Sequence, residues 1–169
     1  MDLDFMLGHL PRLLKATTLT IQLTILSLFF GVFVGAFFAV LRTSKNKILQ
    51  LISYYYSYIF RGTPLLVQIF IIYFGFGQVE WIRESFLWVL FKEAYTCAIL
   101  AFTLNTGAYT SEIFRSAFET INKGFIEAAD GLGMNKRNIF FKIKLPIAIK
   151  QSLPAYGNEM ILMLKGTSL

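Results

Sequence analysis

Two groups of residues have types and spacings that could do chemistry. The first lies in a polar stretch between apolar segments and consists of Glu127, Ala128, Ala129, Gly133, Ile143, Leu145 and Pro146. The second lies within apolar segments and consists of Gln68, Asn105, Asn158, Glu159 and Lys165. An acid, amides and a base together suit a zwitterion, because they offer partners to its ammonium and carboxylate groups.

The second group is a candidate substrate pathway. Polar side chains are costly in lipid unless they face protein or water. Amides in spanning helices also commonly hydrogen-bond to neighbouring helices, and that role remains open for Gln68 and Asn105. Glu112 and Arg115 lie three residues apart, and we expect a local ion pair between them.

Catalysis and metal binding are disfavoured by what the chain lacks. His9 is the only histidine and Cys97 the only cysteine, which disfavours a zinc site, a disulfide framework or a His-dependent triad. The sequence also contains no Gly-rich phosphate loop ending in Gly-Lys-Ser/Thr. We therefore expect a non-enzymatic chain that binds neither a metal nor a cofactor of its own.

The elements that must position these residues are apolar helices. Hydrophobic residues make up 56% of the 169 positions and charged residues only 15%, so a bilayer is a simpler solvent than water. We expect one all-α, polytopic membrane domain over residues 1–169, with about four spanning helices. Their predicted ranges are 17–41, 50–78, 94–114 and 154–169. The first is expected to stay in the mature protein, because the chain opens with the acidic MDLDF and this apolar stretch is longer than the core of a signal peptide.

Local signals modify these helices. Pro64 lacks an amide donor and disfavours helix at the residue before it, which predicts a break over Arg61, Gly62, Thr63 and Pro64. Gly31 and Gly35 permit another helix to approach the first one closely. The stretch 81–93 is too short and too charged to span. It is either a short helix in the outer interface or an extension of the third helix.

The distribution of charge predicts an orientation. The net charge is +6, and seven of the sixteen bases lie in the connector 115–150. Because Lys and Arg are retained in cytoplasmic loops, we place this connector in the cytoplasm and the amino terminus outside. Nucleic-acid binding, the other interpretation of a basic chain, is disfavoured because the bases are dispersed over loops beside apolar segments.

Within the connector, small residues predict a short helix that can approach another surface closely. Gly131 and Gly133 are placed to end this helix. Taken alone, Glu127 would more simply cap a solvated helix, with Ala128 and Ala129 as helix-forming filler.

The connector nevertheless resembles the cytoplasmic loop of the inner-membrane permease subunits of bacterial ABC importers. The family signature, Glu-Ala-Ala, three residues, Gly, nine residues, Ile-any-Leu-Pro, is matched in full by Glu127, Ala128, Ala129, Gly133, Ile143, Leu145 and Pro146. The resemblance implies a helical bundle of the type I importer permease kind. It also implies that this loop docks on a cytoplasmic ATPase and couples ATP hydrolysis to the membrane helices.

Further motifs resemble the branch that carries polar amino acids, the histidine, glutamate, glutamine and arginine group. They comprise Arg61 to Gln68, Ala108-Tyr109, Glu112 to Arg115, Lys123-Gly124, Leu153-Pro154, Gly157-Asn158, Lys165 and Thr167 to Leu169. The sequence departs from this branch at Phe125, Ile147, Glu159 and Gly166. The departures bear on which amino acid is carried.

The resemblance implies the rest of an importer in the inner (cytoplasmic) membrane. Expected partners are an ABC ATPase dimer that uses ATP and Mg, a second permease subunit, an extracytoplasmic solute-binding protein and membrane lipid, but no nucleic acid. Family members continue past the Lys165 to Leu169 stretch, so we expect the last helix to be missing here. A secondary transporter or channel without an ATPase would explain the spans but not the coupling signature. A membrane-embedded enzyme would need a catalytic cluster that the sequence lacks.

Overall fold

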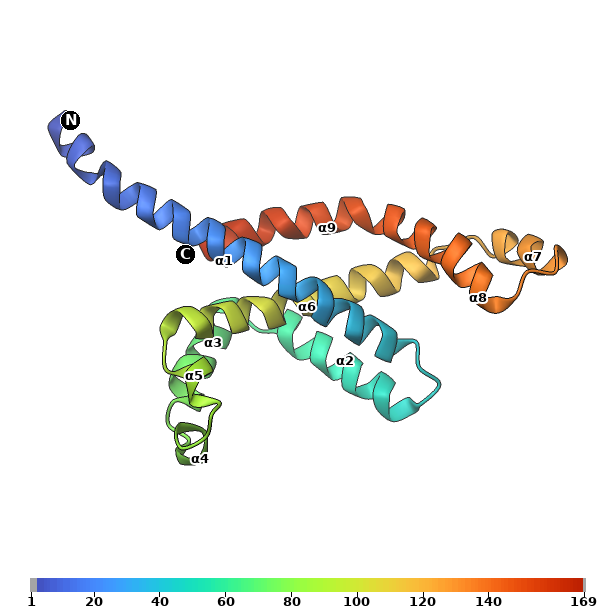
Figure 1. Cartoon of the computed structure of the whole chain (residues 1–169), viewed down its shortest axis with the longest axis horizontal. Helices are drawn as coiled ribbons and strands as arrows, with labels where there is room; N and C mark the ends of the chain where they lie inside the picture. The colour runs from blue at the N-terminus through green and yellow to red at the C-terminus, as the bar shows by residue number, and fades with distance from the viewer. Residues whose placement is uncertain (1–2, 169) are drawn as a thin grey trace.

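The computed structural model describes residues 3–168, and it describes the side chains of residues 9–168. The described residues form helices joined by turns, without a strand, which confirms the all-α prediction (Figure 1). Three residues lie outside the described part of the chain, namely Met1, Asp2 and Leu169. The expectations for the amino terminus and for the motif that ends at Leu169 extend to these residues. In chain order the elements are α1 (Leu3–Arg42), α2 (Lys47–Gly62), α3 (Leu65–Phe70), the π-helix η1 (Ile71–Gly75), α4 (Glu80–Arg83), α5 (Trp88–Phe91), α6 (Ala94–Glu119), α7 (Lys123–Gly131), α8 (Lys136–Ile139), the π-helix η2 (Phe140–Lys144) and α9 (Leu145–Thr167).

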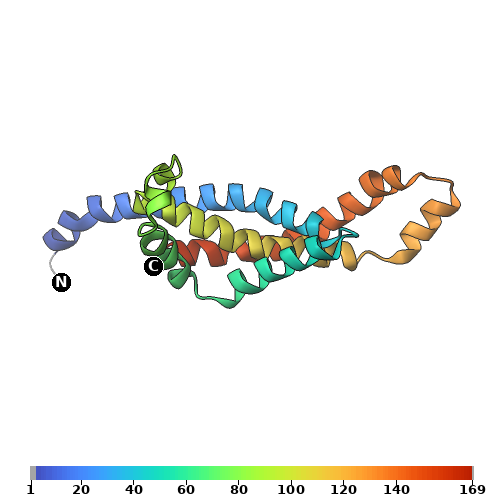
Figure 2. The same ribbon diagram turned by 90° about the horizontal axis from the view of Figure 1, so that it is seen from below.

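Helix α6 is the centre of the bundle. Helices α1, α2, α3, α5 and α9 all pack against it, and its contact with α1 is the most extensive. The short helices α4 and α5 form a lobe on one side of the bundle, and α7 with α8 forms a hairpin beyond its far end (Figure 1). The view turned by 90° shows the same hairpin projecting past the other helices (Figure 2).

Glycines allow α1 and α6 to approach closely. A Cβ atom at Gly35 would lie 2.6 Å from Cβ of Thr110, and one at Gly31 would collide with the methyl group of Thr106. Across the same interface, a Cβ at Gly107 would lie 2.8 Å from Cγ1 of Val34. The prediction that Gly31 and Gly35 admit a neighbouring helix is confirmed.

The contacts also give the helix directions. Residues 31 and 35 of α1 meet residues 106 and 110 of α6 in that order, so the two helices run parallel. Helix α9 runs antiparallel to α1. The hydroxyl groups of Thr24 and Thr167 lie 2.7 Å apart, and the hydroxyl of Tyr156 donates to the carbonyl of Leu28 at 3.4 Å.

The helices differ in how apolar they are. By length and composition, the part of α1 from His9 to Arg42 can cross a membrane, and α2 with α3 and η1 can do so as one pair bent by 108°. Helices α6 and α9, at 26 and 23 residues, fall outside this group of the described helices. One of the four expected spans therefore meets the test, and a second meets it where the bent pair counts as one span. Polar residues within α6, including Thr103, Asn105 and Thr110, lower its mean hydropathy, and all three are buried against protein.

Several helix boundaries differ from the predicted ones. Helix α6 continues to Glu119 and α9 begins at Leu145, so the connector expected over 115–150 is helical at both ends. Arg115 favours the extension of α6, because it pairs with Glu112 one turn before it and with Glu119 one turn after it. The stretch 81–93 contributes to two short helices, α4 and α5, and α6 begins after it.

We predict that Gly35→Ala lowers the free energy of unfolding by about 1–3 kcal/mol, because the added methyl group overpacks the contact with Thr110. Gly157→Ala is the matched control, since a Cβ there meets nothing within 4 Å. It should leave stability unchanged or raise it by about 0.5–1 kcal/mol through helix propensity. Unfolding in detergent measures both variants, and equal effects would contradict the packing described here.

Candidate functional site

Helix α7 contains Glu127, Ala128 and Ala129, and Gly133 follows its end, so it holds the first half of the motif that ends at Pro146. The helix has a defined cap at each end. At its start, the side-chain oxygen of Asn122 accepts a hydrogen bond from the amide of Gly124 at 2.8 Å. At its end, the amide of Gly133 donates to the carbonyl of Asp130 at 2.9 Å, and the amide of Met134 donates to Ala129 at 3.1 Å. These two bonds form a Schellman motif, which satisfies carbonyls at the helix end.

The Schellman motif explains why glycine stands at position 133. Gly133 has a φ of +74°, the left-handed conformation that glycine adopts without a steric penalty. It is the one residue of the described chain with a positive φ. Gly131, which the sequence also offered as a helix stop, is the last residue of α7 instead.

Helix α7 has an inner face and an outer face. Ala129 is only 2% exposed, and Ile126 packs on a core cluster of Ala117, Ile121 and Ala148. The outer face shows the opposite pattern. Phe125 is 57% exposed and Leu132 is 82% exposed, and the two lie seven residues apart on one side of the helix. Large apolar side chains on a projecting hairpin indicate a surface for a protein partner.

The second half of the motif, Ile143, Leu145 and Pro146, joins the hairpin to the bundle. Ile143 belongs to η2 and Leu145 begins α9, and both are half-buried. Pro146 lies in the first turn of α9, where a missing amide donor is tolerated. The core cluster of Ala117, Ile121 and Ala148 combines the end of α6, the turn after it and α9, so α7 packs on a cluster that joins two helices of the bundle.

Helix α2 ends at Gly62 and α3 begins at Leu65, so Thr63 and Pro64 lie between two helices whose axes differ by 108°. Gln68 is buried at this break. Its amide nitrogen donates to the carbonyl of Phe60 at 2.8 Å, and to the carbonyl and hydroxyl oxygens of Thr63 at 3.0 and 2.7 Å.

The structure brings Asn105 to the same break. Its amide nitrogen donates to the carbonyl of Phe60 at 3.0 Å and to the side-chain oxygen of Gln68 at 3.1 Å. The two amides therefore bind the free carbonyls at the end of α2 and fix the break to α6. This geometry favours the helix-linking role that the sequence left open for them.

The polar residues of α9 separate onto different faces. Glu159 is 6% exposed and faces the bundle, close to Thr106 and within the electrostatic field of Arg61. Asn158 and Lys165 are exposed in the single chain and lie seven residues apart on another face. One chain therefore does not gather the five candidate pathway residues into one site.

A cavity of 460 Å³ lies between the end of α2, α6 and α9. Arg61, Tyr109, Gln151 and Ser152 are among the residues that line it. The guanidinium of Arg61 stacks over the ring of Tyr109, with its carbon 5.3 Å from the ring centroid. The sequence interpretation assigned Arg61 only to the helix break. Its charge within an apolar segment was a signal that it could also line a cavity.

An ion-pair network connects this cavity to the end of α1. Nε of Arg115 lies 2.8 Å from a carboxylate oxygen of Glu112, which confirms the expected pair, and Nη1 lies 2.5 Å from Glu119. Hydrogen bonds to Glu112 and then to Glu119 raise the pKa of Arg115 above its ordinary value. Glu112 also faces Arg42, at 3.9 Å.

Comparison with protein families gives one match over most of the chain. Residues 27–169 match the family described as "Binding-protein-dependent transport system inner membrane component". The chain is 47% identical to the nopaline transport system permease protein NocM of Agrobacterium fabrum, over 100% of this chain and 70% of that protein. It is 40% identical to the arginine ABC transporter permease protein ArtM of Haemophilus influenzae, over 95% of this chain and 70% of that protein. It is 43% identical to the histidine/lysine/arginine/ornithine transport system permease protein HisM of Escherichia coli K12, over 89% of this chain and 64% of that protein.

Solved structures show the same fold. A chain of a crystal structure described as an amino acid ABC transporter with histidines superposes with a TM-score of 0.86 at 35% identity, over 99% of this chain and 74% of that one. A chain of the MetNI methionine ABC transporter in an inward-facing conformation superposes with a TM-score of 0.71 at 22% identity, over 98% and 74% of the two chains. The helices and the projecting hairpin thus form the bundle of a type I ABC importer permease.

Proposed function

The chain belongs to the family of inner membrane components of binding-protein-dependent transport systems, and we propose that it carries a polar amino acid across the inner membrane, driven by a separate ATPase. Its relatives are amino-acid permeases of ABC transporters, so the chain is a membrane subunit of an ABC importer. The observation that carries the coupling proposal is the hairpin of α7. Its outer face exposes Phe125 and Leu132, and its inner face packs on α6 and α9.

The two faces of α7 suggest how coupling works. Phe125 and Leu132 on the outer face would contact a cytoplasmic ATPase subunit, and closure of the ATPase dimer would displace the hairpin. Ile126 and Ala129 on the inner face would then move the ends of α6 and α9 together, because packed apolar contacts resist compression. Gly133, Ile143, Leu145 and Pro146 keep the proposed coupling role by setting the shape of this hairpin. Glu127 and Ala128 are exposed on α7 and keep that role at its surface.

The proposed importer has further subunits. ATP and Mg are used by a dimer of ATPase subunits, and an extracytoplasmic solute-binding protein delivers the amino acid. A second permease subunit, identical or paralogous, would cover the exposed face of α9 that carries Asn158 and Lys165. Because α1 and α6 run parallel and opposite to α9, the start of α1 and the hairpin lie at opposite ends of the bundle. The bases of the connector assign the hairpin to the cytoplasm, so the amino terminus is proposed to lie outside.

Among the polar residues of the apolar segments, Arg61 and Glu159 are the best-supported members of the proposed substrate pathway. They carry opposite charges within apolar segments, and Arg61 lines the cavity between α2, α6 and α9. A guanidinium suits the carboxylate of an amino acid, and a carboxylate suits its ammonium group or a basic side chain. Gln68 and Asn105 support this site from the helix break rather than facing an open path.

For the pathway, we predict that Glu159→Gln reduces uptake about tenfold or more, because a charge-assisted hydrogen bond to the substrate becomes a neutral one. The substrate is first identified by binding a panel of amino acids to the partner solute-binding protein. Uptake by proteoliposomes containing the whole transporter is then measured. Glu84→Gln, an exposed acid in the turn after α4, is the control and should leave uptake unchanged. Equal uptake by both variants would remove Glu159 from the pathway.

For coupling, we predict that Gly133→Val reduces stimulation of the ATPase by the loaded binding protein about tenfold. A β-branched residue strongly disfavours the positive φ that ends α7, whereas Gly133→Asn tolerates it and should retain most of the stimulation. Leu132→Asp should also reduce stimulation, because it places a charge in an apolar contact. Full stimulation and uptake in both Gly133→Val and Leu132→Asp would refute the coupling role.

A further inference from the structure

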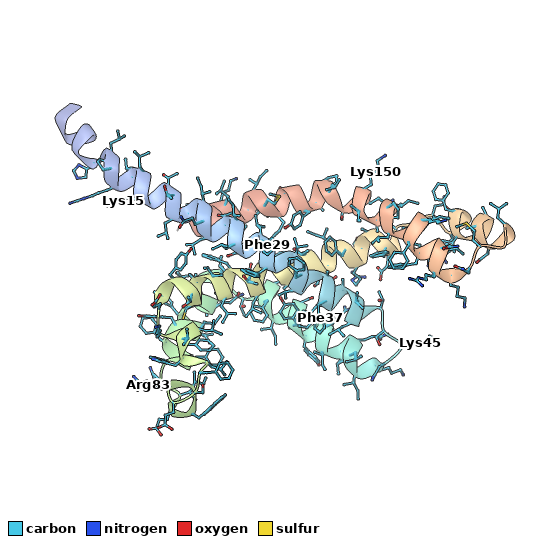
Figure 3. The ribbon with its side chains drawn as sticks, viewed as in Figure 1. Lys15, Phe29, Phe37, Lys45, Arg83 and Lys150 are labelled. Carbon is cyan, nitrogen blue, oxygen red and sulfur yellow. The ribbon has the colours of Figure 1, made fainter. Side chains whose placement is uncertain are left out.

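A second cavity, of 670 Å³, lies where the turn between α1 and α2 meets α6. Its charged lining residues are Arg42, Lys47, Arg115 and Glu119, and the side chains of Gln50 and Tyr54 complete the polar part of the wall. In Figure 3, the labelled Lys45 shows where this turn lies. The turn is well separated from the lobe of α4 and α5, where Arg83 is labelled. The coupling hairpin contributes no residue to this cavity's lining.

The charges of this cavity do not cancel. The charge of Arg115 is already balanced by two acids, because Nε pairs with Glu112 at 2.8 Å and Nη1 pairs with Glu119 at 2.5 Å. Arg42 is only weakly paired, since its Nη2 lies 3.9 Å from Glu112, beyond hydrogen-bond distance. Lys47 has no ion-pair partner in the described part of the chain. Three bases therefore face two acids, and the surplus positive charge lies on Arg42 and Lys47.

Arg42 is held in place yet lacks an acceptor. Its guanidinium carbon lies 4.8 Å from the centroid of the Tyr54 ring, so the group is stacked on an aromatic face. Its Nη1 is buried and has no hydrogen-bond partner among residues 3–168. A buried donor without an acceptor is costly. Arg42 also lines the cavity, and a phosphate oxygen there would be an acceptor of matching charge and geometry for its guanidinium.

The outer surfaces of α1 and α2 next to the cavity are apolar. Phe37 and Val40 of α1 and Leu51 of α2 are exposed large hydrophobic residues beside this turn. The turn joins the ends of two apolar helices, so it lies at the depth of the lipid headgroups. A ligand that fits both features carries a negative headgroup and an apolar tail. Basic pockets between membrane helices bind such headgroups.

We propose that this cavity binds the phosphate headgroup of an anionic phospholipid. Arg42 and Lys47 contact the phosphate, Tyr54 holds the guanidinium of Arg42, and the acyl chains run along the exposed residues of α1 and α2. The site requires only that the turn between α1 and α2 lie at the membrane surface. It can therefore exist even where the proposed coupling through α7 fails.

The test uses the whole transporter, reconstituted in vesicles with equal parts of phosphatidylglycerol and phosphatidylcholine. Native mass spectrometry counts the lipids that stay bound after gentle release. Lys47→Gln removes an exposed, unpaired base, so folding should not depend on it. Lys150→Gln is the matched control, because Lys150 is an exposed base on α9 outside the cavity lining (Figure 3). A melting temperature for each variant checks that it folds.

The proposal predicts retained phosphatidylglycerol in the native transporter and in Lys150→Gln, and an affinity about fivefold lower in Lys47→Gln. Retention should also survive inorganic phosphate in the buffer, because a lipid contributes acyl contacts that free phosphate lacks. Three results would each overturn the proposal. They are equal retention of the two lipids, equal loss in Lys47→Gln and Lys150→Gln, and displacement of phosphatidylglycerol by inorganic phosphate, which would assign the cavity to a free anion.

Discussion

The close approach of α1 and α6 is the contact on which the rest of the structure depends. Gly31, Gly35 and Gly107 leave no room for a side chain between the two backbones. The hydroxyls of Thr106 and Thr110, buried at this contact, have no hydrogen-bond partner within the described part of the chain. Apart from the weak pair of Arg42 and Glu112 at its end, the interface is therefore held by van der Waals packing. Such packing drives helix association within lipid, where burial of apolar surface brings little gain.

Once α6 is fixed, it supports both functional regions. At the helix break, Asn105 and Gln68 share the carbonyl of Phe60, so α2 and α3 are tied to the middle of α6. At the opposite end, Ala117 belongs to the cluster on which the hairpin of α7 packs. A displacement of the hairpin and a change at the break thus act on one helix. This shared support gives the proposed coupling a physical route.

The sequence predicted features that depend on local chemistry. The helix stop at Gly133 follows from residues within one turn, and Gly31 and Gly35 were recognised from their spacing. Contacts between residues far apart in the sequence could not be predicted in this way. Gln68 and Asn105 are 37 positions apart, and their hydrogen bond depends on how α6 is rotated. Asn158 and Glu159 are adjacent polar residues, so periodicity did not decide which one faces the bundle, and packing of α9 buries Glu159.

The most direct test of the central claim asks what the outer face of α7 touches. A photoreactive maleimide is attached to Leu132→Cys in the assembled transporter, while the native Cys97 is buried and protected from labelling. Arg83→Cys, in the lobe of α4 and α5, provides the control position. The account predicts a cross-link to the ATPase subunit from position 132 and none from position 83. No cross-link from position 132, or equal cross-links from both positions, would contradict it.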